Sequence, residues 1–109
     1  MWKCRNVTVE NVKIMSYDEW SDGIDVMCSE NIVIRHVFVK NEDDCISIKA
    51  SKHRPYNYEG GDVRNVLVEN CVFWSGPRGN SMEIGYELNN GVIEDVTFRS
   101  IDVIHRRTR

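Results

Sequence analysis

The sequence predicts an all-β fold, a parallel β-helix of about four coils without caps, forming one partial domain over residues 1–109. The first observation is a nine-residue phrase in which apolar residues alternate on both sides of a polar corner. Its four copies begin 25, 34 and 30 residues apart, at Asn6, Asn31, Asn65 and Asp95. The second is that no three-turn stretch has helical spacing, and the third is that Val and Ile fill the inward positions. A strand repeat of this length indicates a solenoid.

Each copy of the phrase contains two short strands that meet at a polar corner, which is Asn11, His36, Asn70 or Ser100. A third short strand follows each of the first three copies. It consists of an apolar-polar-apolar triplet: Ile24-Asp25-Val26, Ile46-Ser47-Ile48 and Met82-Glu83-Ile84. Alternation puts two side chains of each triplet into the core and the middle one on the outer face. We therefore expect three parallel sheets, with matching residues stacked about 4.8 Å apart.

Neither end of the chain carries a recognisable cap. The first phrase begins at Asn6, and the outer strand that should precede it is missing. At the other end, the spacing from Asn65 to Asn80 places the next outer strand just beyond Arg109. We interpret the chain as an internal segment of a longer solenoid. A monomer is expected, although open sheet edges would permit edge-to-edge association.

Composition excludes several classes of partner. The net charge of −3 and the absence of a basic tract argue against nucleic acid. No run approaches the ~20 apolar residues of a membrane span, so no membrane partner is expected. The four cysteines show no metal-ligand spacing, and neither a metal nor a cofactor is predicted. Cys45 and Cys71 fall on inward positions, whereas Cys4 and Cys28 could lie on neighbouring coils within reach of a disulfide.

Three carboxylates are the candidates for chemistry: Asp22 on one coil, and Asp43 and Asp44 on the next. Asp22, Asp44 and Asn80 align in the repeat, so they form a column on one edge. Crowded carboxylates repel each other, which raises the pKa of at least one and keeps a proton available near neutral pH. Glycoside hydrolysis needs such a set, because one carboxyl protonates the leaving oxygen and another activates water. A solvated ladder of acidic turns is the alternative that these residues leave open.

Three segments resemble a known family: WSDGIDV from Trp20, NEDDCISIK from Asn41 and GNSMEIG from Gly79. They are similar to the NTDG, DD and GHG signatures of polygalacturonase-type glycoside hydrolases of family 28. The resemblance implies a right-handed, single-stranded parallel β-helix that hydrolyses a pectin-like polysaccharide with inversion, secreted or in the periplasm. It makes Asp43 the general acid, and Asp22 and Asp44 the residues that hold and activate water. Inversion needs acid and base carboxyls about 6.5–9.5 Å apart.

The chain departs from the family pattern at three places. Trp20-Ser21 stands where the family has Asn-Thr, Asn80 stands in place of the histidine of GHG, and the basic RIK signature would fall beyond residue 109. The substrate is therefore open. A dextranase-like glucan hydrolase of family 49 and a non-catalytic carbohydrate-binding or structural β-helix are the alternatives. A calcium-dependent pectate lyase is disfavoured, because no arginine aligns with the acidic column.

Sugar binding is expected around the acidic column. Asp25, Ser47 and Glu83 are the middle residues of the short strands and project from one sheet, so they and Asn80 are candidate substrate-binding residues. Trp20 lies just before the first aspartate, where its flat apolar face could stack on a pyranose ring.

Overall fold

Parallel β-strands make up the fold. The computed structural model describes residues 1, 3–18, 21–50, 61–76, 79–84 and 91–105, and no helix occurs among them. Long strands alternate with short ones along the chain. The long strands are β1 (Arg5–Met15), β3 (Glu30–Asn41), β5 (Val63–Ser75) and β7 (Ile93–His105), and the short strands are β2 (Ile24–Met27), β4 (Ile46–Lys49) and β6 (Met82–Ile84).

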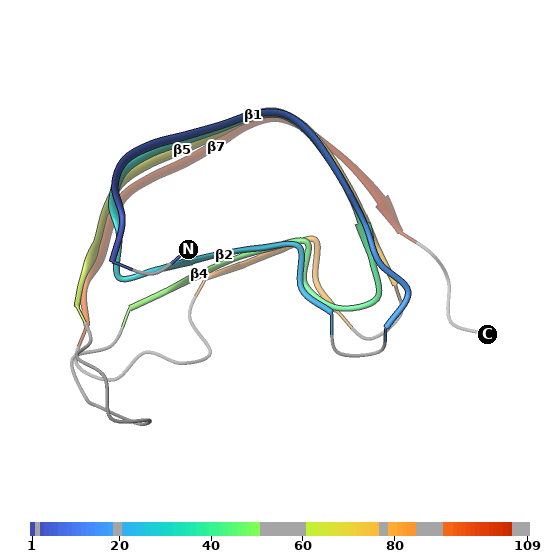
Figure 1. Cartoon of the computed structure of the whole chain (residues 1–109), viewed down its shortest axis with the longest axis horizontal. Coiled ribbons are helices and arrows are strands. Elements are labelled where there is room, and N and C mark those ends of the chain that lie inside the picture. The colour runs from blue at the N-terminus through green and yellow to red at the C-terminus, as the bar shows by residue number, and fades with distance from the viewer. Residues whose placement is uncertain (2, 19–20, 51–60, 77–78, 85–90, 106–109) are drawn as a thin grey trace.

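The strands form two parallel sheets. The long strands pair in the order β1-β3-β5-β7 and the short strands in the order β2-β4-β6. The chain passes from one sheet to the other and stacks each turn on the one before, as Figure 1 shows. The predicted all-β parallel β-helix is confirmed. In the part of the chain that the structure describes, no helix is long and apolar enough to span a membrane.

Each long strand bends at its polar corner without ending there (Figure 1). The four corner residues have φ between 52° and 58°: Asn11, His36, Asn70 and Ser100. Pairing continues on both sides of the first corner, from Glu10 with Arg35 to Val12 with Val37. The prediction of three separate sheets was therefore wrong. A single residue in the left-handed region redirects the strand, and the hydrogen-bonded ladder resumes immediately after it.

A second corner lies at the start of each phrase, and it carries an asparagine ladder. Asn6, Asn31, Asn65 and Asp95 have φ between 55° and 59°. Asn31 Nδ2 donates to Asn6 Oδ1 at 3.0 Å, and Asn65 Nδ2 donates to Asn31 Oδ1 at 2.8 Å. Asn and Asp tolerate this conformation better than most residues. This tolerance explains why a small polar residue opens each phrase.

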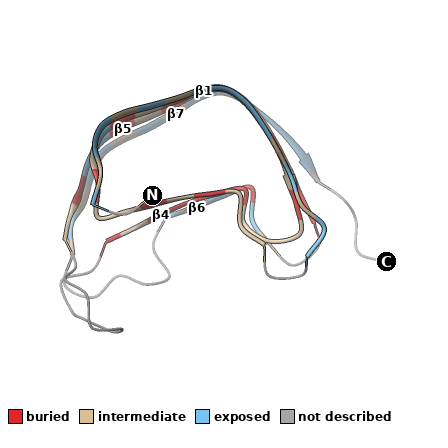
Figure 2. Ribbon diagram, viewed as in Figure 1, coloured by how far each residue is buried: buried red, intermediate tan, exposed pale blue. Residues whose placement is uncertain are grey.

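The core lies between the two sheets and is built from stacked inward side chains. The inward residues of the middle long strands are buried: Ile32, Ile34, Val66 and Val68. The matching residues of the outer strands pack against this core but are only partly buried: Val7, Val9, Val96 and Phe98. Figure 2 shows the same gradient, with burial concentrated on the middle strands. The apolar alternation thus identified the inward face of the long strands correctly, whereas Met82 and Ile84 of β6, which were expected in the core, are 38% and 54% exposed.

Candidate active site

The acidic cluster lies where the chain turns from a long strand into a short one. Asp22 precedes β2, and Asp43 and Asp44 lie between β3 and β4. Two backbone hydrogen bonds join these turns: Gly23 N donates to Asp44 O at 2.8 Å, and Asp43 N donates to Ser21 O at 3.2 Å. Carboxylate oxygens of the three aspartates lie within 4.8 Å of one another, and all three residues are half-buried. The structure therefore brings together the three aspartates that the sequence singled out.

Glycines allow the turns to approach this closely. A Cβ on Gly23 would lie 2.3 Å from the carbonyl oxygen of Cys45, and a Cβ on Gly79 would lie 2.0 Å from the carbonyl carbon of Asp43. Neither space accommodates a side chain. Gly23 and Gly79 belong to the two turns on either side of the turn that carries Asp43 and Asp44. Their lack of a side chain lets these turns approach it closely and so helps to fix the positions of the carboxyls.

Asn41 holds the same turns from inside. Its side chain is buried. Nδ2 donates to Ser21 O at 2.9 Å and to Asp44 O at 2.8 Å, and Oδ1 accepts a hydrogen bond from Cys45 Sγ at 3.2 Å. Sequence reasoning assigned no role to this residue. The available signal was a polar residue at an inward position of β3, because buried amides are retained only where they are hydrogen-bonded.

The electrostatics of the cluster single out Asp22. Burial, a hydrogen bond with Asp25 and the charges of Asp25 and Asp43 together raise the pKa of Asp22 to about 7, while Lys49 acts in the opposite direction. Lys49 Nζ lies 4.0 Å from Asp25 Oδ2. Crowding was expected to leave one carboxyl protonated near neutral pH. The raised pKa makes Asp22 the carboxyl that meets this expectation, whereas the family resemblance gave the donor role to Asp43.

Hydrogen bonds orient the other two carboxyls. Asp44 N donates to Asp43 Oδ1 at 2.9 Å, and Asn80 N donates to Asp44 Oδ1 at 2.8 Å. The three carboxylates could also ligate a hard cation, which prefers oxygen ligands. The arrangement thus offers one carboxyl with a raised pKa beside two carboxyls that backbone hydrogen bonds orient.

The predicted sugar-binding residues differ in how they are placed. Ser47 is 0% exposed and donates its hydroxyl hydrogen to Asp25 Oδ1, so the expectation that it faces a sugar is not met. Asn80 is exposed, and its Nδ2 donates to Glu83 Oε2 at 2.6 Å. Asp25 and Glu83 are half-buried beside the cluster. Trp20 lies outside the described residues.

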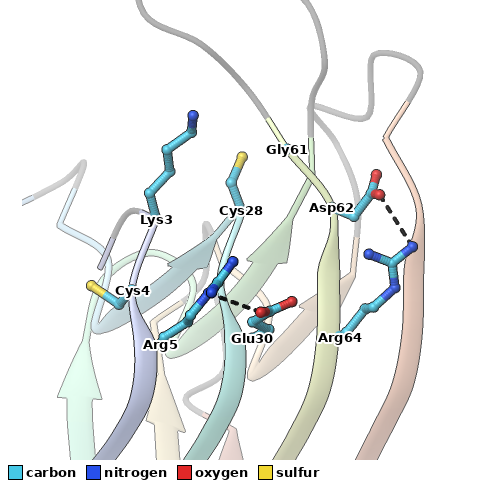
Figure 3. A pocket seen from close by; sticks show the side chains of 8 residues that line it. All are labelled: Lys3, Cys4, Arg5, Cys28, Glu30, Gly61, Asp62 and Arg64. Atoms are coloured by element: carbon cyan, nitrogen blue, oxygen red, sulfur yellow. Dashed lines mark ion pairs between the residues drawn. The ribbon is translucent and has the colours of Figure 1, made fainter.

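A separate cavity of about 430 Å³ lies at the opposite end of the long strands (Figure 3). Its lining comprises Lys3, Cys4, Arg5, Cys28, Glu30, Gly61, Asp62 and Arg64. Arg5 pairs with Glu30 at 2.9 Å and Arg64 with Asp62 at 3.3 Å. The thiols of Cys4 and Cys28 point apart, and no disulfide joins them. The cavity therefore shows no catalytic arrangement comparable to the aspartate cluster.

Comparison with known proteins finds similarity to a family of glycosyl hydrolases. The family model described as Glycosyl hydrolases family 28 matches residues 1–107. A probable rhamnogalacturonase A of Aspergillus oryzae is 33% identical over 101 residues, which are 90% of this chain and 18% of that protein. An endo-polygalacturonase of Pectobacterium carotovorum is 33% identical over 88 residues, 78% of this chain and 20% of that protein. A probable polygalacturonase of Arabidopsis thaliana is 26% identical over 120 aligned positions, 91% of this chain and 26% of that protein.

The chain is short relative to these proteins, since it spans between 18% and 26% of their length. No solved structure matches it.

Proposed function

The chain belongs to glycosyl hydrolases family 28, and on that premise we propose that the protein hydrolyses glycosidic bonds in a pectin-type polysaccharide. The observation that carries the proposal is the convergence of Asp22, Asp43 and Asp44, with oxygens within 4.8 Å of one another. The named activities of the relatives, rhamnogalacturonase and polygalacturonase, suggest a polymer that contains galacturonate. By resemblance to this family we also propose that the protein is secreted or periplasmic.

We assign the general acid to Asp43 and the handling of water to Asp22 and Asp44. In this mechanism the Asp43 carboxyl gives its proton to the glycosidic oxygen as the bond to the anomeric carbon breaks. Water attacks that carbon from the opposite face, and its proton passes to Asp22 or Asp44. The nearest-oxygen spacing of 4.8 Å or less is below the range of about 6.5–9.5 Å between carboxyls of inverting enzymes. Attack of water from the face opposite the leaving oxygen inverts the anomeric carbon, so proton NMR of the first-formed sugar should show the inverted anomer, and a retained anomer would overturn this mechanism.

The raised pKa of Asp22 makes this residue an alternative general acid, and the two assignments can be tested against each other. An aryl glycoside with a good leaving group needs no proton from the enzyme, whereas the polysaccharide does. If Asp43 is the acid, Asp43→Asn lowers polysaccharide cleavage by about 10²–10⁴-fold and affects the aryl substrate much less. Asp22→Asn should slow both substrates, because it impairs the handling of water. If Asp22→Asn instead lowers cleavage of the polysaccharide much more than that of the aryl glycoside, and Asp43→Asn slows both, then Asp22 is the acid.

The assay needs a protein of the relatives' length that carries these residues, and it needs a matched control. Asp18→Asn removes the same charge at an exposed position a few residues before the cluster, so it should leave turnover unchanged. Equal activity of Asp43→Asn and the parent protein on polysaccharide would exclude Asp43 from the mechanism.

Carbohydrate binding without catalysis is the second candidate, and Asn80 is the observation that favours it. Its amide occupies the place of a family histidine and is engaged with Glu83, so this position offers no titratable group. Polysaccharide retention in affinity electrophoresis without release of reducing ends would establish this candidate instead.

A further inference from the structure

Asp25 lies beside the aspartate cluster, on the outer face of the sheet that the short strands form. It is the second residue of β2, and it pairs with Ser47 of β4, which in turn pairs with Glu83 of β6. The side chain of Asp25 is 27% exposed, and Ser47 is fully buried. A carboxyl that is largely covered needs polar partners. The partners of Asp25 therefore indicate what this carboxyl does.

Two side chains of the neighbouring turn hold the Asp25 carboxyl. Ser47 Oγ donates to Asp25 Oδ1, and Lys49 Nζ lies 4.0 Å from Asp25 Oδ2. The side chain of Lys49 is itself only 14% exposed, so water screens this ion pair less than it would a pair on the open surface. Both oxygens of Asp25 therefore face protein groups, which argues against the substrate-binding role that its outward position suggested.

The third partner of Asp25 is the Asp22 carboxyl, with which it shares a hydrogen bond. The same contact recurs two turns away, where Asn80 Nδ2 donates to Glu83 Oε2 at 2.6 Å. Asp22 and Asn80 each stand two residues before a short strand, and Asp25 and Glu83 are each the second residue of that strand. The shape of the turn thus brings the residues at these two positions together.

The hydrogen bond between Asp22 and Asp25 has a definite polarity. Two carboxyls can share a hydrogen bond only when one of them carries a proton, because an ionised carboxylate has no donor. The pKa of Asp22, raised to about 7, makes this residue the source of the proton, and Asp25 Oδ1 already accepts from Ser47. Asp22 is therefore the donor and Asp25 the acceptor. One oxygen of Asp22 is then committed to Asp25, and the other remains for the reacting groups.

We propose that Asp25 is a positioning residue for the hydrolysis, which accepts a hydrogen bond from the Asp22 carboxyl and fixes the orientation of that carboxyl. Ser47 and Lys49 hold Asp25 in place for this task. The inference rests on the glycoside hydrolase function proposed above. It applies whether Asp22 orients the attacking water or gives up its proton, because a displacement of about 1 Å can cost about 10²-fold in rate in either case. Asp25 acts through Asp22 and does not touch the substrate.

A double-mutant cycle between Asp25 and Asp22 tests this role in a protein of the relatives' length that carries these residues. Asp25→Asn keeps the shape of the side chain and an acceptor for Ser47, but it turns an N–H toward the Asp22 carboxyl in place of an acceptor. In the parent protein it should lower kcat on polysaccharide by about 10–100-fold and leave KM nearly unchanged. In the Asp22→Asn background it should lower kcat by less than about twofold, because residues that act as a unit do not contribute additively.

Asp18→Asn is the matched control, because it removes the same charge at an exposed position before the cluster, and it should leave kcat unchanged in both backgrounds. Ser47→Ala removes the hydroxyl that holds Asp25 and should lower kcat by several-fold, again only while Asp22 is present. Circular dichroism checks folding, and Ser47→Ala carries the test if Asp25→Asn does not fold. The same cycle on urea midpoints needs no activity and should also be non-additive, so the contact is measured even where Asp22→Asn has no detectable turnover.

The outcomes separate this inference from the function on which it rests. In an active parent protein, an unchanged kcat, equal losses from Asp25→Asn in both backgrounds, or additive urea midpoints each overturn the inference alone. A raised KM with an unchanged kcat would make Asp25 a sugar-binding residue instead. A parent protein that cleaves no pectin-type polysaccharide overturns the proposed function, and this inference with it.

Discussion

Replacing Gly23 with alanine tests the close contact that positions the acidic turn. The added Cβ would lie 2.3 Å from Cys45 O and 2.5 Å from Val39 Cγ1, so the turns must separate by about 1 Å to reach normal contact. Overpacking of this kind costs about 1–3 kcal/mol. Weakening of the hydrogen bond from Gly23 N to Asp44 O adds about 1 kcal/mol. The free energy of unfolding should therefore fall by about 2–4 kcal/mol.

Gly61→Ala is the matched control for this substitution. Its added Cβ would lie 3.5 Å from Cys28 Cβ, an ordinary contact, so stability should change by less than about 1 kcal/mol, with either sign. Urea denaturation followed by circular dichroism measures both variants, and an unchanged m-value shows that the midpoint shift reports stability. Equal losses in Gly23→Ala and Gly61→Ala would refute the steric argument.

Substitutions at three further residues test the site and the corners in the same denaturation assay. Asp22 has a folded-state pKa of about 7, above the ordinary value of 3.8, so the folded protein binds this proton more tightly and stability falls as pH rises through that interval. Asp22→Asn should flatten the fall, and an unchanged pH slope would contradict it. Asn41→Ala removes three hydrogen bonds of a buried amide, although Ser21 O and Asp44 O each keep a backbone donor. At about 1 kcal/mol for each bond the loss should be about 2–4 kcal/mol, and a loss below about 1 kcal/mol would show that the amide does not stabilise these turns. Asn31 has φ of 59°, so Asn31→Ala should cost about 1 kcal/mol more than Asn31→Gly, and equal losses would remove the backbone explanation.

The fold could be predicted because the repeat encodes two geometric facts directly. Alternation with a period of two identifies the inward face, and the polar residue at each corner marks where the strand bends. The continuity of the bent strand could not be predicted in the same way. Whether a corner ends a strand depends on φ at one residue, and a polar residue such as His36 is compatible with either outcome.

The site was predictable only as far as the column of aligned residues. Position in the repeat brings Asp22 next to Asp44, because stacked turns lie one strand spacing apart. Burial of Ser47 and the raised pKa of Asp22 depend on which atoms of neighbouring turns lie nearby. Spacing along the sequence carries no information on those atoms. The role of Asn41 has the same origin, since its partners come from two different turns.

Ion pairs between neighbouring long strands help to set the register that forms the aspartate cluster. Arg35 pairs with Glu10 at 3.2 Å and with Glu69 at 3.6 Å on the outer face of the long sheet. Asp22 and Asp43 belong to successive turns, so the cluster forms only when β1 and β3 pair in the observed register. A shift of two residues would preserve the inward face but displace one turn by about 6.6 Å along the strand, which exceeds the 4.8 Å that contains the carboxylate oxygens. The same shift would separate Arg35 from Glu10. Ion pairs that contribute little to stability therefore disfavour a register shift of two residues, which hydrophobic packing alone would tolerate. By disfavouring this shift they keep the three carboxyls together.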